Sequence, residues 1–283
     1  MQAETIAATR NLHSRLGHVG HQPVSVTSFT NKRFTVNFRL PLDQLRRLLP
    51  PRIEPDPIGD TGQGMLSMCA CDFWVLKLGL LPIPPIRNND MLCRISARIR
   101  KRGRTWRAYY TLRSDSSSVL LGTLGSRFSH FRKRISRFSR IDDGRKYRLD
   151  CRARDPLCGG WLEAEMGSIT KTPPASSVFA DAEEATDFVF RLDGSCGYRF
   201  EDDRLSFQRI DYPDWDISFC HRFRYGFALI DHVAETFGLD LELDSTLFME
   251  RTFQVWGRSW LYRDEEGPSA DLARRLLPRA AAM

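Results

Sequence analysis

Two lysines, Lys133 and Lys146, stand in a stretch that is otherwise rich in arginine and aromatic residues, and Lys133 lies in the middle of its first half. The stretch FSHFRKRISRFSRIDDGRKYRLDCRAR, residues 128–154, contains Lys133, while the whole chain of 283 residues has six lysines against 36 arginines. A lysine on an apolar surface is partly desolvated, and desolvation lowers the pKa of a lysine side chain. A neutral lysine amine is a nucleophile that forms a Schiff base with a carbonyl compound. The chemistry of this stretch therefore depends on which way Lys133 points.

A turn signal inside the stretch predicts a β-hairpin. Asp142-Asp143-Gly144 predicts a three-residue loop, because glycine adopts the left-handed conformation that closes such a loop. Residue 141 then faces residue 145, and odd-numbered residues face odd-numbered residues. The odd face is mostly apolar and the even face mostly charged, and a slip of one residue would mix the two. The odd face consists of Phe131, Lys133, Ile135, Arg137, Ser139, Ile141, Tyr147, Leu149, Cys151 and Ala153.

This register predicts that Lys133 points inward, between Phe131 and Ile135, and that the even-numbered arginines face water. Arg137 on the same face adds a positive charge, which also lowers the pKa of a lysine. The alternative is that Lys133 extends to the edge of the ribbon and has no chemical role. A basic ribbon could also bind nucleic acid or another anionic partner. We rank that reading last, because acidic residues accompany the dispersed basic ones.

Composition predicts a cytoplasmic globular protein without a metal or cofactor. Hydrophobic residues make up 42% and charged residues 27%, with a net charge of +7, which bears on solubility and not on fold. No run approaches the ~20 apolar residues that span a bilayer, and the N-terminus lacks the apolar core of a signal peptide. The seven cysteines include no CxxC pair, which favours reduced thiols. No phosphate-loop spacing occurs, and Cys69-Ala70-Cys71 is too tight for a structural zinc site.

The order of elements predicts a mainly antiparallel α+β domain, because strands predominate without a βαβ rhythm. We expect residues 31–263 to form this domain, preceded by an arm at 1–30 and followed by a tail at 264–283. Periodicity and turn residues predict the elements inside it. They are strands at 32–41, 64–78, 161–170 and 247–263, hairpins at 91–115 and 197–210, helices at 42–50, 117–130, 181–192 and 223–238, and a proline-rich loop at 81–87.

Residues 31–260 resemble a known superfamily in the order of their elements. The segments NKRFTVNFRLPLDQLRRLLPPRIEPD, GMLSMCACDFWV and ARIRKRGRTWRAYYTL follow one another as in acetoacetate decarboxylase-like proteins. The closing segment FMERTFQVWGRSW is similar to the last strand of the YqjF-like branch, whose function is unknown. The resemblance implies a cone-like, largely antiparallel β-barrel with helices packed outside and a central cavity. It also implies that the chain can assemble as a homo-oligomer.

For part of this superfamily the resemblance implies a lyase reaction. A lysine in an apolar cavity forms a Schiff base with a β-keto acid, and a second lysine lies beside it after a proline. Here the corresponding region reads Ser129-His130-Phe131-Arg132-Lys133-Arg134. Lys133 is the lysine available to act, and His130 is the alternative occupant of the aligned position. The YqjF-like branch generally lacks the lysine pair.

The resemblance also implies residues that bind and orient the substrate. The arginine of the family near the first strand falls at Lys32 or Arg33, which keeps the positive charge. The glutamate of the family falls near Leu66 or Ser67, so a carboxylate is absent there. Arg137 and Tyr147, on the predicted face of Lys133, are further candidates for contact with the substrate.

We therefore carry three hypotheses of function. The first is an enzyme acting on a keto acid or related carbonyl compound through an imine at Lys133. The second is a protein that binds a small ligand in the same place without covalent chemistry. The third is binding of nucleic acid or an anionic partner through the basic ribbon, which predicts a steep dependence of affinity on salt.

Overall fold

A computed structural model describes most of the chain. The described residues are 8–9, 12, 22–101, 104–125, 131, 133–155, 157, 159–199, 203–212 and 215–262. The histidines of the N-terminal arm, the predicted turn at 102–103, His130 and the predicted tail lie outside these residues. No helix within the described ranges is long and apolar enough to cross a membrane.

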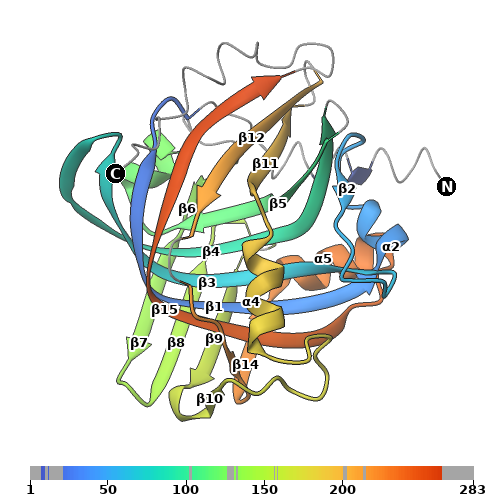
Figure 1. Ribbon diagram of the computed structural model, residues 1–283. Coiled ribbons are helices and arrows are strands. Elements are labelled where there is room, and N and C mark those ends of the chain that lie inside the picture. Colours follow the sequence, from blue (N-terminus) through green and yellow to red (C-terminus); the bar gives the residue numbers. More distant parts are fainter. Residues whose placement is uncertain are drawn as a thin grey trace, which may run out of the picture.

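A ring of hydrogen-bonded strands forms the body of the molecule (Figure 1). The first and last strands of the ring pair with each other, so its edges are satisfied by hydrogen bonds. The neighbours are antiparallel except for one parallel pair, β5 with β11. In order around the ring the strands are β1 (Val26–Pro41), β3 (Gln63–Leu78), β4 (Leu81–Lys101), β5 (Arg104–Ser116), β11 (Gly194–Arg199), β12 (Arg204–Asp211) and β15 (Glu242–Tyr262).

Shorter strands extend this ring and build a second sheet below it in the view of Figure 1. The extensions are β2 (Glu54–Pro55), β6 (Lys133–Ile135), β10 (Ile169–Thr170) and β13 (Ser218–Cys220). The second sheet has the order β14 (Phe223–Phe227), β9 (Gly160–Glu165), β8 (Lys146–Arg152) and β7 (Arg137–Asp142). The predicted α+β class, dominated by antiparallel strands, is confirmed.

The strands β1, β3, β4 and β5 have one polar and one apolar face, and both are buried. Successive side chains of a strand point to opposite faces, so the pairing registers assign each residue to one of them. We call "polar face" the one that includes Arg33, Thr35, Asn37, Ser67, Cys69, Cys71, Asp90, Arg94, Tyr109 and Ser114. We call "apolar face" the one that includes Phe34, Val36, Phe38, Leu66, Met68, Ala70, Cys93, Ile95 and Tyr110.

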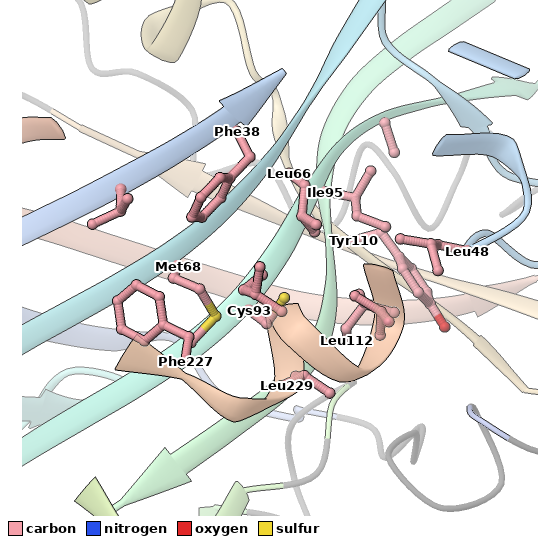
Figure 2. Packing of buried hydrophobic residues seen from close by; sticks show 14 of the residues in the cluster. Phe38, Leu48, Leu66, Met68, Cys93, Ile95, Tyr110, Leu112, Phe227 and Leu229 are labelled. Carbon is pink, nitrogen blue, oxygen red and sulfur yellow. The ribbon is translucent and has the colours of Figure 1, made fainter. Parts of the chain in front are cut away.

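The apolar face packs against helix α5 (Ala228–Phe237) and the second sheet. Figure 2 shows Phe227 and Leu229, at the start of this helix, against Met68 and Cys93 of the strands. The second sheet contributes Tyr147, Leu149, Cys151 and Leu162 to the same core. Removing this much apolar surface from water is the main favourable contribution to the free energy of folding.

Two other helices lie where sequence analysis predicted them. Helix α4 (Ala182–Phe190) begins at Asp181, whose side chain accepts a hydrogen bond from the Glu184 amide at 2.8 Å. It packs in a second core with Met65, Leu247 and Met249. Helix α2 (Leu42–Arg46) ends before Pro50. Helix α5 ends at Gly238, which has a positive φ of 57°.

The structure corrects the register of the predicted hairpin. Asp142 lies opposite Tyr147, and Phe138 lies opposite Cys151, so even-numbered residues of β7 face odd-numbered residues of β8. The cause is a longer loop, because the Asp143 side chain accepts hydrogen bonds from the amides of Arg145 and Lys146 at 2.9 and 2.7 Å. Ile141, predicted to face inward, is 54% exposed.

The first strand of that hairpin is also divided into two strands. Its first part, β6, pairs in parallel with β5 of the ring, whereas its second part, β7, belongs to the second sheet. Four further predictions need correction. The first five residues of the helix predicted at 223–238 form strand β14, and the helix begins at Ala228. Residues 81–87 begin the long strand β4 and are not a loop. The segment 161–170 is interrupted by a 3₁₀ turn, Met166–Ser168. Within 117–130 the described helical residues end in a π-helix, Leu121–Gly125.

The observed register predicts a specific cross-link. Opposed residues of antiparallel strands have their Cβ atoms about 4.5–5.5 Å apart, close to the separation in a disulfide. We expect Phe138→Cys to form a disulfide with Cys151 under mild oxidation, read as a cross-linked peptide by mass spectrometry. Ile135→Cys is the matched control, since the odd-to-odd register would place residue 135 opposite Cys151. A cross-link from position 135 and none from 138 would contradict the observed pairing.

Candidate functional site

Lys133 projects onto the polar face from strand β6. It lies opposite Ser114 in the parallel pairing with β5. Its Nζ atom is 2.6 Å from Oδ2 of Asp90 and 3.3 Å from Oγ of Ser114, and its side chain is 14% exposed. The rings of Phe131 and Phe73 have their centroids 5.3 and 5.9 Å from the ammonium nitrogen. Lys133 was predicted to lie on an inner face between Phe131 and Ile135. It does lie beside Phe131, but Ile135 is 45% exposed, so that part of the prediction is wrong.

Asp90 is the buried partner of this lysine. Burial raises the pKa of the Asp90 carboxyl, and Lys133 and Asn88 act against that shift by stabilising the carboxylate. Asn88 donates a hydrogen bond to Oδ1 of Asp90 at 3.0 Å. The amide oxygen of Asn88 in turn accepts hydrogen bonds from Oγ of Ser116 at 2.8 Å and from the amide of Ser118 at 2.9 Å. The carboxyl group is therefore held in one orientation beside the amine.

Arg33 lies in the same row of the sheet. It is opposite Cys71 on β3, which is itself opposite Asp90 on β4. The side chain is buried, its Nε donates to Sγ of Cys71 at 3.2 Å, and its guanidinium carbon lies 4.9 Å from the ring centroid of Trp215. The polar face therefore brings an amine, a carboxyl group and a guanidinium into one neighbourhood.

Cys71 is a neutral group in this neighbourhood. Burial raises the pKa of its thiol to about 11, in spite of the opposing effect of Arg33. At neutral pH the sulfur is therefore a protonated thiol, which is neither a strong nucleophile nor a counter-charge for the guanidinium.

The other residues predicted for the site lie elsewhere or outside the described residues. Lys32 points to the opposite face, where its Nζ is 2.7 Å from Asp142 and 6.0 Å from the ring of Tyr147. Tyr147 is buried in the apolar core and stacks on Phe34 at 4.9 Å. Arg137 is exposed on β7. His130 lies outside the residues that the structure describes. Lys133 and Arg33 are thus the predicted candidates that the fold brings to one face.

Three arginines of the basic stretch are paired with carboxylates. Arg148 contacts Asp150 at 2.8 Å and Glu163 at 3.1 Å, and Arg134 contacts Asp155 at 3.5 Å. Arg140, predicted to face water, forms an ion pair with the fully buried Asp72. Much of the positive charge that marks this stretch in the sequence is compensated within the molecule.

Sequence analysis missed two residues of the polar face, Asp90 and Arg94. The signal for them was the alternation of the strand from 90 to 99, in which every odd-numbered residue is apolar. That pattern predicts that Asp90 and Arg94 share the other face. The carboxylate expected near Leu66 or Ser67 is indeed absent there, and Asp90 brings one to Lys133 from another strand.

A cavity of about 10 Å³ lies on the other side of these strands, beside Met68, Met91 and Leu229. It also contacts Arg113 and Asp115, which form a buried ion pair at 2.5 Å. Its volume is close to the minimum of about 10–15 Å³ that one water needs. Lys133 is not among the residues that line this cavity. A central cavity on the polar face stays a prediction.

Comparison with known proteins shows which solved structures share this fold. No family model matches the sequence, and no curated protein sequence matches it. Among solved structures, the enduracididine biosynthesis enzyme MppR complexed with pyruvate is 14% identical, with a TM-score of 0.53 over 87% of this chain and 92% of that chain. Acetoacetate decarboxylase from Legionella pneumophila is 10% identical, with a TM-score of 0.53 over 84% and 88%.

An acetoacetate decarboxylase-like enzyme from Sphingomonas wittichii is 12% identical, with a TM-score of 0.54 over 86% of this chain and 93% of that one. At such identities the likeness concerns the path of the chain and not its chemistry. The closer likeness to the YqjF-like branch stays a prediction. The chain has the fold of the acetoacetate decarboxylase-like enzymes.

Proposed function

We propose that this protein is a small-molecule enzyme in which Lys133 forms a Schiff base with a keto acid. The observation that carries the proposal is the contact of 2.6 Å between the Lys133 amine and the buried Asp90 carboxyl, in the same row as Arg33. Two proteins of similar fold, an enzyme complexed with pyruvate and an acetoacetate decarboxylase, support a keto acid as the ligand.

The first role of Asp90 is to move a proton. Because burial raises its pKa, the carboxylate can accept a proton from the Lys133 ammonium when substrate excludes water. The neutral amine attacks the carbonyl carbon, and a new C–N bond forms while the carbonyl π electrons move to oxygen. The oxygen takes the proton that Asp90 holds, Asp90 then carries a second proton from the nitrogen to the resulting hydroxyl, and that hydroxyl leaves as water. The product is a protonated imine between Lys133 and the ligand.

The second step uses this imine as an electron sink. In a β-keto acid the bond between the α carbon and the carboxylate breaks, and its electrons move toward the imine nitrogen as carbon dioxide leaves. The enamine then takes a proton at carbon, and water hydrolyses the imine to release the ketone and the free lysine. This is a lyase reaction, and it needs no metal or redox cofactor.

Arg33 is the residue that we assign to the substrate carboxylate. Its guanidinium is permanently charged, and the adjoining Cys71 thiol is neutral, as its raised pKa of about 11 requires. A guanidinium binds a carboxylate through two parallel hydrogen bonds. Arg33 would hold the acid group while the carbonyl faces Lys133.

A second function is favoured by the same contact. A carboxylate beside an ammonium stabilises the charged form, and the charged form does not attack carbonyl carbon. The protein would then bind its ligand without covalent chemistry. In that case Lys133→Ala leaves the affinity for a keto acid nearly unchanged, as isothermal calorimetry would show.

Borohydride trapping tests the imine. We expect incubation with pyruvate or acetoacetate and sodium borohydride to give a stable secondary amine at Lys133, located by peptide mass spectrometry. Lys133→Arg should abolish the adduct. Lys146→Arg, a control at a half-exposed lysine that pairs with Glu163 at 2.9 Å, should leave it unchanged. Absence of an adduct at Lys133 across a panel of keto acids would reject the covalent mechanism.

Replacement of Asp90 separates its two effects. Asp90→Asn removes the counter-charge of the ammonium, so we expect borohydride trapping to extend to lower pH than in the wild type. The same change removes the proton carrier, so release of carbon dioxide should fall by ~10²–10⁴-fold. Asp142→Asn is the control, because that carboxylate pairs with Lys32 on the other face. Unchanged turnover in Asp90→Asn would show that Asp90 is only a structural partner.

A further inference from the structure

A second arginine of the polar face is buried, and the part of the chain that the structure describes gives it no counter-charge. Arg94 on β4 is 6% exposed, and its guanidinium carbon lies 3.6 Å from the ring centroid of Tyr109. Its Nε atom is buried and has no hydrogen-bond partner among the described residues. Within the described residues, no carboxylate lies within ion-pair distance of this side chain.

Arg33 is in the same condition. It is 4% exposed, and its hydrogen-bond partner in the described part of the chain is the Cys71 thiol. Both guanidiniums have an aromatic ring over one face, Trp215 for Arg33 and Tyr109 for Arg94. Stacking of this kind leaves the N–H edges of the guanidinium for a ligand that lies in its plane.

The positive charges of Arg33 and Arg94 affect the same two tyrosines. Burial is the main cause that raises the pKa values of Tyr109 and Tyr212, and both Arg94 and Arg33 oppose that rise. Each phenol therefore lies within electrostatic reach of both arginines, although the two arginines come from β4 and β1. Both phenols are neutral near pH 7, as is the Cys71 thiol, so none of these groups compensates the arginines.

Two acid groups near this face, in the described part of the chain, each have another cation close by. Asp90 pairs with Lys133 at 2.6 Å. Asp56 lies 3.4 Å from Arg107. Within the described residues, neither guanidinium has an anion. Such an arrangement is costly, because buried charges in proteins are normally paired. A ligand with two negative charges would compensate both.

We propose that the site binds a dicarboxylate, with Arg33 on one acid group and Arg94 on the other. This inference deepens the proposed function and rests on it for one point, that the ligand carries a ketone for Lys133 and is therefore a keto diacid. The in-plane N–H edges of stacked guanidiniums match the planar carboxylate. Arg94 then sets the preference for a diacid over the monocarboxylic keto acids.

Binding of acids that lack a carbonyl tests the inference independently of imine chemistry. We expect succinate or glutarate to bind the wild-type protein ~10–100-fold more tightly than butyrate, since hydrogen bonds to a charged group are worth ~1.5–3 kcal/mol. Isothermal calorimetry at fixed ionic strength gives the affinities. Equal affinities for diacid and monoacid would overturn the proposal, and so would sulfate binding as tightly as the best diacid.

Variants assign the effect to Arg94. Arg94→Gln should lose the preference for the diacid while keeping the affinity for butyrate. Arg104→Gln is the matched control, because this exposed arginine stacks on Trp106 at 4.1 Å on the next strand, and it should keep the preference. Lys133→Ala should keep it too, so that failure of the imine mechanism and failure of the diacid site give different results. A preference that survives in Arg94→Gln would overturn the assignment.

The stability of the ligand-free protein supplies a second measurement. If the charge of Arg94 is uncompensated, replacing it with an apolar side chain of similar length should not destabilise the fold. We expect Arg94→Met to melt at the same temperature as the wild type or higher, and to lose the stabilisation that glutarate gives the wild type. A lower melting temperature without ligand would show that Arg94 is a structural cation and would contradict the proposal.

Discussion

Desolvation of charged groups on one face of a closed ring of strands is the constraint on which the candidate site depends. The pairing of β1 with β15 closes the ring of strands, and the side chains of the polar face are buried. Each buried charge there must find a partner within the molecule or from a ligand. Lys133 and Asp90 satisfy this requirement mutually. Arg33 and Arg94 have no such partner among the described residues, and this contrast distinguishes an internal ion pair from a place for an anion.

The apolar face provides the stability that a buried polar face cannot. Phe34, Val36, Phe38 and Leu40 of β1 are all buried, and they pack in one core with helix α5 and the second sheet. The two faces alternate along the same strands, so the backbone that anchors Phe34 also fixes the position of Arg33. A substitution in the apolar core therefore acts on the site through the strand, without touching any group of the polar face.

The fold was largely predictable from sequence because its signals are local. Helices α4 and α5, the strand β1 and the hairpin of β11 and β12 follow from periodicity, a capping aspartate and turn residues. The register of β7 and β8 was wrong because one side chain, Asp143, lengthens the loop. A loop longer by one residue changes the parity of every pair, so a local error exchanged the faces of a whole strand.

The site was less predictable, because its partners are distant in the chain. Lys133 was identified from its neighbours in sequence, but Asp90 lies 43 positions away and meets it only through the pairing of β4, β5 and β6. The resemblance to a known superfamily directed attention to Leu66 and Ser67, because the superfamily has a glutamate near these positions and this chain has none. A fold shared at 10–14% identity fixes the path of the strands but not which strand supplies a given functional group. The alternation from 90 to 99 could have placed Asp90 on the polar face, but only the pairing of the strands shows that its carboxyl group meets Lys133.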